Sequence, residues 1–200
     1  MPFISNGTTI LDNGAFSASL GSLILLSEQT ASASASISFT SGLDSTYPIY
    51  KFELINIHAA TNDTPFKFQG STDGGSNYNV TMTTTRFKAG HNEADSYYTL
   101  SYETGTDQGQ GTGFQQISQN MGNLNDENGS GELYLFAPSS TTFVKHFMCR
   151  FANQQHAEQG YDDFTAGYFN TTSAINAIQY KFESGNIDSG TIKLYGIKDS

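Results

Sequence analysis

The stretch from Asp126 to Glu132 (DENGSGE) carries oxygen-bearing side chains at alternating positions, with glycine between them. Calcium prefers several such oxygen ligands presented by one loop. Asp126, Asn128 and Ser130 are therefore the candidate calcium ligands. The stretch departs from the EF-hand loop, because Ala137 stands where that loop requires a bidentate glutamate. The calcium pattern is thus incomplete, and we expect no cofactor.

The histidines and the single cysteine do not form a recognisable site. His58, His91, His146 and His156 show none of the short spacings that zinc sites use. Cys149 follows His146 by three positions, which places the two side chains on opposite faces of a strand. Phenylalanines alternate with Cys149 along this segment, so we expect a buried, unreactive thiol. A lone cysteine also excludes a disulfide within the chain.

Two acidic pairs, Glu93 with Asp95 and Asp162 with Asp163, lie in segments that read as polar loops. A glycosidase needs two carboxylates on opposite sides of a cleft, and nothing in the spacing provides that arrangement. We therefore interpret both acidic pairs as solvated charges in loops. No catalytic residue is predicted, and we expect a protein that is not an enzyme.

Four tyrosines, Tyr97, Tyr98, Tyr161 and Tyr168, are the candidate recognition residues. Aromatic rings in polar surroundings can stack on sugar rings, so a carbohydrate-binding module is one alternative function. The polar segments 103–131 and 153–163 are the expected recognition loops, since long loops frequently carry function.

The composition indicates a folded, strand-rich protein. Of the 200 residues, 13% are aromatic and 14% are charged, which is the opposite of a disordered composition. The formal charge is −10, and the basic residues are scattered without a run. Because nucleic-acid binding needs a concentrated positive surface, we do not expect it.

The N-terminal region contains no basic segment, and its apolar run at 20–26 is short and interrupted by glycine and serine. We therefore expect neither a signal peptide nor insertion into a membrane.

Alternation of apolar and polar residues is the main structural signal. It is clearest at 31–39, at 50–58 and at 142–151. About nine or ten short strands with frequent turns predict an all-β fold, an antiparallel β-sandwich of the jelly-roll-like kind. Residues 1–20 read as an N-terminal arm and 21–200 as a single sandwich domain.

Several pairings follow from the same patterns. The last quarter, 172–200, reads as a half-buried hairpin with its turn at 184–186 and a second loose point at Gly190, and this hairpin would close the sandwich. Residues 66–68 read as the hairpin partner of 50–58. The segment 105–131 reads as an irregular loop, with a short helix carrying Phe114, Ile117, Met121 and Leu124 on one face as the alternative. The segment 142–151 reads as a long strand that could lie at a sheet edge.

The closing sequence SGNIDSGTIKLYGIK (184–198) and the middle segment FQGSTDGGSNY (68–78) carry a recurring pattern. Both resemble small β-rich virion proteins of tailed phages, in which a strand ends in S-x-D-G-G and the chain closes with an SG-x-I-x-LYG motif. The resemblance covers about a third of the chain. Its motif residues read as structural, with Gly185 and Gly190 in turns and Ile192 and Leu194 in the core.

The resemblance implies a virion protein, assembled in the host cytoplasm and without enzymatic activity. A tail-associated fibre or adhesin that takes part in host attachment is the leading expectation. A capsid decoration protein, which stabilises the shell, is the alternative within the same class. The expected partners are other copies of the chain, with a trimer as one fitting symmetry, other virion proteins and a host-surface glycan. The long strand at 142–151, if left at an edge, would require an oligomer to cover it.

Overall fold

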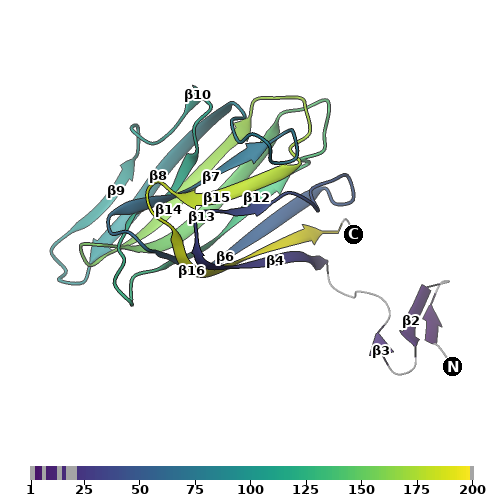
Figure 1. The fold of residues 1–200 in the computed structure, drawn as a ribbon, viewed down its shortest axis with the longest axis horizontal. Coiled ribbons are helices and arrows are strands. Elements are labelled where there is room, and N and C mark those ends of the chain that lie inside the picture. The colour runs from purple at the N-terminus through teal and green to yellow at the C-terminus, as the bar shows by residue number, and fades with distance from the viewer. Residues whose placement is uncertain (1–2, 6–7, 13–14, 17–21, 199–200) are drawn as a thin grey trace.

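The computed structural model describes residues 3–5, 8–12, 15–16 and 22–198. Every regular element in these ranges is a β-strand, and every strand pair is antiparallel, as the alternation predicted (Figure 1). No helix of the described residues is long and apolar enough to cross a membrane.

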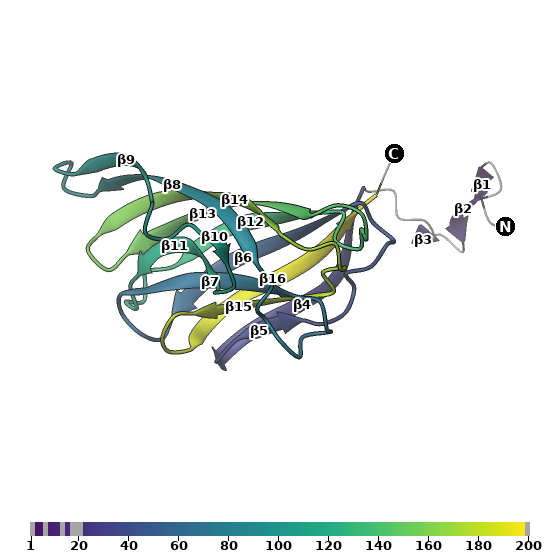
Figure 2. The same cartoon turned by 90° about the horizontal axis from the view of Figure 1, so that it is seen from above.

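Thirteen strands form one sheet that folds into two layers (Figure 2). The larger layer contains, in spatial order, β4 (Leu23–Ser34), β16 (Ile187–Ile197), β6 (Ile49–Ala59), β12 (Gly129–Phe136), β13 (Lys145–Gln155), β14 (Gln159–Phe169), β8 (Met82–Asn92) and β9 (Tyr98–Tyr102). The smaller layer contains β5 (Ile37–Phe39), β15 (Ala177–Phe182), β7 (Thr64–Ser71) and β11 (Gln115–Met121). The short strand β10 (Gly109–Gly111) pairs with β8.

The two layers are joined along both sides. On one side β11 meets β13 at a single position, Met121 opposite Gln155. On the other side the chain itself turns from β4 into β5. The predicted single strand at 31–39 is therefore wrong, because it bends at residues 35 and 36 and contributes one strand to each layer.

Three further strands belong to the predicted N-terminal arm. They are β1 (Phe3–Ser5), β2 (Thr8–Asp12) and β3 (Ala15–Phe16), and they form a three-stranded sheet of their own. The predicted boundary between arm and domain, at residues 20 and 21, lies outside the described residues.

Aromatic side chains fill the space between the layers. Phe66 and Phe68 from the smaller layer pack around Tyr180, and Phe52 and Phe147 approach them from the larger layer. All five are buried. Ring centroids lie 5.0–6.2 Å apart, the usual range for favourable aromatic pairs. Interlocking rings therefore connect the two layers, and aliphatic residues fill the rest of the core.

The predicted closing hairpin is wrong in its pairing. Both strands and the turn at Gly185 exist, but β15 lies between β5 and β7 while β16 lies between β4 and β6. The two strands are in different layers because both carry an apolar row toward the interior, for example Tyr180 on β15 and Leu194 on β16. The predicted pairing of 66–68 with 50–58 fails for the same reason, since β7 pairs with β15 and β11.

The segment 105–131 is neither an irregular loop nor a helix, since it contains β10, β11 and the start of β12. Several buried residues of β11 are polar, so the alternation of apolar and polar residues does not predict this strand. Gln115 accepts a hydrogen bond from the Thr84 hydroxyl at 2.7 Å, and the Ser118 hydroxyl accepts one from the backbone of Phe66 at 2.8 Å. The helix-like spacing combines residues of different kinds, because Phe114 precedes β11 whereas Ile117 and Met121 are buried within it.

The predicted strand at 142–151 exists as β13, but it lies in the middle of its layer, between β12 and β14. Phe147, Cys149 and Phe151 are buried as expected, whereas Phe143 precedes the strand and is exposed. The edge-strand argument for an oligomer therefore does not apply to this strand.

Gly190 lies inside β16 and not in a turn, at a bulge opposite Asn56 and Ile57. Its φ is +126°, and an added Cβ would lie 2.8 Å from the Asn56 carbonyl oxygen. We expect Gly190→Ala to lower the free energy of unfolding by about 2 kcal/mol, measured by urea denaturation. Gly109→Ala is the matched control, because a Cβ there meets nothing within 4 Å. Equal stability of the two variants would contradict this account.

Candidate functional site

The calcium candidates lie in the loop before β12 and at the start of that strand. Asp126 and Asn128 are exposed, and the Ser130 hydroxyl already accepts a hydrogen bond from the backbone N–H of Asn56 at 2.9 Å. Among the residues that the structure describes, no group of three or more His, Cys, Asp or Glu side chains is arranged to hold a metal ion.

The four candidate tyrosines separate into two environments. Tyr161 is buried on the inner side of the larger layer, where its hydroxyl donates to Gln159 at 2.6 Å and lies 3.4 Å from the hydroxyl of Tyr97. Tyr98 and Tyr168 lie on the outer side, but they are far apart along their strands. The four residues therefore do not form one recognition surface.

Cys149 and the histidines add no reactive group. The Cys149 thiol is buried, and burial raises its pKa far above the ordinary value, as expected for an unreactive thiol. His146 lies on the opposite face of β13, against Tyr168. The other histidines each lie beside one aspartate near the same end of the sandwich: His58 beside Asp188, His91 beside Asp95 and His156 beside Asp63.

The outer side of the larger layer carries the most prominent exposed surface. On β8, β13 and β14 about half of the residues that alternate with the core positions are apolar, among them Phe87, Met148 and Phe164. The same side of β9 adds side chains that are strongly exposed, up to 84% for Tyr98 and 78% for Leu100. We call this surface the aromatic face and define it by Phe87, Tyr98, Leu100, Tyr102, Met148 and Phe164.

A ridge of stacked groups crosses the aromatic face. The rings of Phe87 and Phe164 are parallel, with their centroids 4.8 Å apart, because the two residues are direct partners on β8 and β14. The Arg150 guanidinium lies 5.1 Å from the Phe164 ring centroid and extends the stack onto β13. Tyr102, opposite Phe87 on β9, extends it in the other direction. Cross-strand pairing thus builds one continuous row.

Charged and polar groups fix the two ends of this ridge. Asp162 accepts hydrogen bonds from Arg150 Nε at 3.0 Å and from Arg150 Nη2 at 2.7 Å. The Tyr102 hydroxyl donates to Asp107 at 2.6 Å, and this bond raises the pKa of the phenol. The ridge is therefore held in place at both ends before any partner binds.

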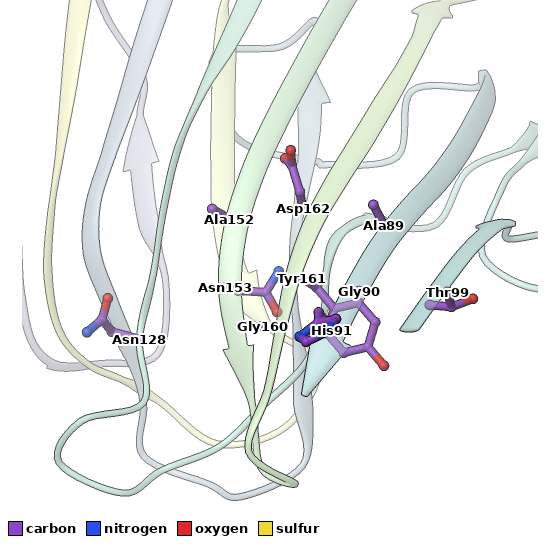
Figure 3. Close-up of a pocket in the computed structure, with 10 residues that line it drawn as sticks. All are labelled: Ala89, Gly90, His91, Thr99, Asn128, Ala152, Asn153, Gly160, Tyr161 and Asp162. Atoms are coloured by element: carbon purple, nitrogen blue, oxygen red, sulfur yellow. The ribbon is translucent and has the colours of Figure 1, made fainter. Parts of the chain in front are cut away.

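Small residues create hollows on either side of the ridge. Figure 3 shows one of them, floored by Ala152, Ala89 and Gly160 and bordered by His91 and Asp162. A second hollow lies across the ridge, where Ala166 and Thr85 leave space beside Met148. Both are open depressions on a broad sheet and not deep clefts.

Directly beneath the aromatic face, the inner side of the same strands carries a buried ion cluster, which we define by Arg86, Asp163, Gln119, Asn153 and Glu103. Arg86 and Asp163 are both completely shielded from solvent and form an ion pair. The expectation that Asp162 and Asp163 are both solvated loop charges is therefore wrong for Asp163. The segment 153–163 is mostly strand, and alternation along β14 sends the two carboxylates to opposite sides.

Asp163 is bound by several donors. Its carboxylate accepts from Asn153 Nδ2 at 2.7 Å and from the backbone N–H of Gln119 at 3.0 Å. Burial raises the pKa of Asp163, and the Arg86 charge opposes that rise. Arg86 also donates to the Thr106 hydroxyl at 2.9 Å, and Glu103 lies 4.0 Å from it. The cluster replaces hydrophobic core at this end of the sandwich and ties β8, β14, β13 and β11 together.

This arrangement provides a rigid, open surface for contact. The ion cluster is enclosed, and Arg86 and Asp163 neutralise each other within it, so it serves the fold. The aromatic face is exposed and organised, and sequence reasoning missed most of it. A signal was present, because the segment HFMCRF at 146–151 has apolar residues at both odd and even positions. Both sides of β13 therefore carry apolar groups.

Comparisons with protein-family models, with curated proteins and with solved structures find no match to this chain.

Proposed function

We propose that this protein is a non-enzymatic structural component of a tailed-phage virion, associated with the tail and acting in host attachment. The observation that carries this proposal is the aromatic face, which is broad, open and apolar. Exposed apolar patches of this kind mark surfaces that bind macromolecules, whereas small-molecule chemistry favours concave sites that enclose their ligand. The resemblance of 68–78 and 184–198 to phage virion proteins supplies the context.

Immunolabelling of purified particles tests the proposal. An antibody raised against this chain is applied to intact particles and imaged by negative-stain electron microscopy. We expect label on the tail. Label confined to the head shell would instead favour a capsid decoration protein, and particles that contain none of the chain by mass spectrometry would overturn the virion assignment.

A carbohydrate-binding module is the second candidate, favoured by the exposed rings of Tyr98 and Tyr102. They lie on the same side of β9, about 13 Å apart, and rings so placed could stack on separate sugars of one chain. A glycan array that gives a signal with the intact protein, and loses it in Tyr98→Ala, would favour this function. Tyr168→Ala is the control, because Tyr168 lies far along the sheet from β9.

A further inference from the structure

We propose that the aromatic face is the docking site for a second copy of this chain, with the two sheets packed face to face about a two-fold axis. This inference rests on the proposed structural role and names the partner of that same surface. Four properties of the aromatic face support it: its exposure, its shape, its charge and its size.

The exposure of the aromatic face is concentrated. Leu100, Tyr102 and Met148 are each more than half exposed, and Phe87 is 43% exposed. These residues come from neighbouring strands β9, β8 and β13, with β14 between the last two. Removing such side chains from water is worth about 25 cal/mol for each Å² of apolar surface. An uncovered face of this kind therefore favours association.

The shape of the face is complementary to itself. A ridge formed by Phe164, Phe87 and Tyr102 lies between two hollows floored by alanine, glycine and threonine. A two-fold rotation can place the ridge of each copy in a hollow of the other. Isologous interfaces require this kind of self-complementarity. Packed sheets lie about 10 Å apart, a distance that interdigitating rings can fill.

The distribution of charge makes this face a better docking site for a second copy than the rest of the surface. The chain carries a net charge of −10, so most orientations of two copies bring negative charges together. Along the ridge, Arg150 and Asp162 neutralise each other, and Asp107 adds one negative charge beside Tyr102. On the neighbouring strands Lys51 is paired with both Glu53 and Glu132 at 3.0 Å, which leaves one net negative charge there. Face-to-face docking therefore avoids much of the repulsion.

The size of the face is adequate. Together with the neighbouring strand β12, the outer side of β13, β14, β8 and β9 is roughly 24 Å wide, at about 4.8 Å per strand, and about as long over four outward positions per strand. The plane alone is then roughly 600 Å², and protruding rings add to it. A stable interface needs about 800 Å² from each partner. The face is therefore in the range of a specific dimer.

The test is the oligomeric state of the intact chain, measured by sedimentation velocity from about 0.1 to about 100 μM. We expect a dimer. Leu100→Glu should weaken it at least 30-fold, because a charge that is desolvated within an interface typically costs that much. Leu124→Glu is the matched control, since Leu124 is 57% exposed in the loop before β12, and we expect it to leave the dimer intact.

A second measurement does not depend on any variant. Hydroxyl-radical footprinting of the unmodified chain should show Tyr98, Leu100, Tyr102 and Met148 less reactive at high than at low concentration, with Leu124 unchanged. A monomer across the whole range, a trimer, or a dimer that protects other residues would overturn the inference. A monomeric chain found on virion tails would remove only this inference. A dimer absent from particles would remove only the virion assignment.

Discussion

Replacing Asp163 with asparagine is expected to lower the free energy of unfolding by about 3–5 kcal/mol. The substitution keeps the shape of the side chain but removes the charge that faces Arg86, which is completely shielded from solvent. Glu103 is 4.0 Å from the guanidinium, too far for a good hydrogen bond. A buried cation without its partner bears a large desolvation cost. Urea denaturation followed by circular dichroism measures the loss.

Asp162→Asn is the matched control for Asp163. It removes the same type of charge from the adjacent position and also breaks a pair with an arginine, but the Arg150 side chain is 63% exposed. Exposed pairs contribute about 0–1 kcal/mol, so a small change is expected. Both variants are best compared in the Leu100→Glu background, where association does not add to stability. Similar losses of unfolding free energy in Asp163→Asn and Asp162→Asn would show that the buried ion pair contributes no more to stability than the exposed one.

Two substitutions of Tyr180 are expected to have different effects on the stability of the protein. Tyr180→Ala should lower the free energy of unfolding by about 3–5 kcal/mol, because it removes a ring that contacts Phe52, Phe66 and Phe68. Tyr180→Phe should leave stability unchanged or raise it by about 1 kcal/mol. The Tyr180 hydroxyl is buried without a hydrogen-bond partner among the described residues, and burial raises its pKa well above the ordinary value.

Tyr50→Phe is the matched control for Tyr180→Phe. The Tyr50 hydroxyl lies 3.0 Å from the Asp44 carbonyl oxygen, 2.9 Å from its carboxylate and 3.1 Å from its backbone N–H. Losing these bonds should lower stability by about 1 kcal/mol. Thermal and urea denaturation of Tyr180→Ala, Tyr180→Phe and Tyr50→Phe test these expected changes in stability. A destabilised Tyr180→Phe would mean that its hydroxyl has a partner after all.

The alternation of side chains predicted the fold class and most strand positions, because a strand with one face in the core must alternate. Alternation does not identify the neighbours of a strand. The apolar row of β15 would fit either layer, so the short turn at Gly185 reads as a hairpin although it connects the two layers. Pairing depends on contacts between distant segments, which a single sequence does not reveal.

Hydropathy also places two neighbouring residues on the wrong sides. On that measure Arg86 belongs in solvent and Phe87 in the core, yet Arg86 is buried and Phe87 lies on the aromatic face. Arg86 can be buried because β14 and β13 place Asp163 and Asn153 on the same inner side of the sheet. The site could therefore not be predicted from residue types, since it arises from cross-strand partners such as Phe87 and Phe164.

The positions of β15 and β16 have a consequence for how the chain acquires its structure. Each enters a layer between two strands from the N-terminal third: β15 between β5 and β7, and β16 between β4 and β6. Until residues 177–197 emerge from the ribosome, neither layer can be completed. Four strand edges are left unpaired in that interval, and unpaired edges invite aggregation. Folding should thus be slow, and a chain truncated before Ala177 should be insoluble.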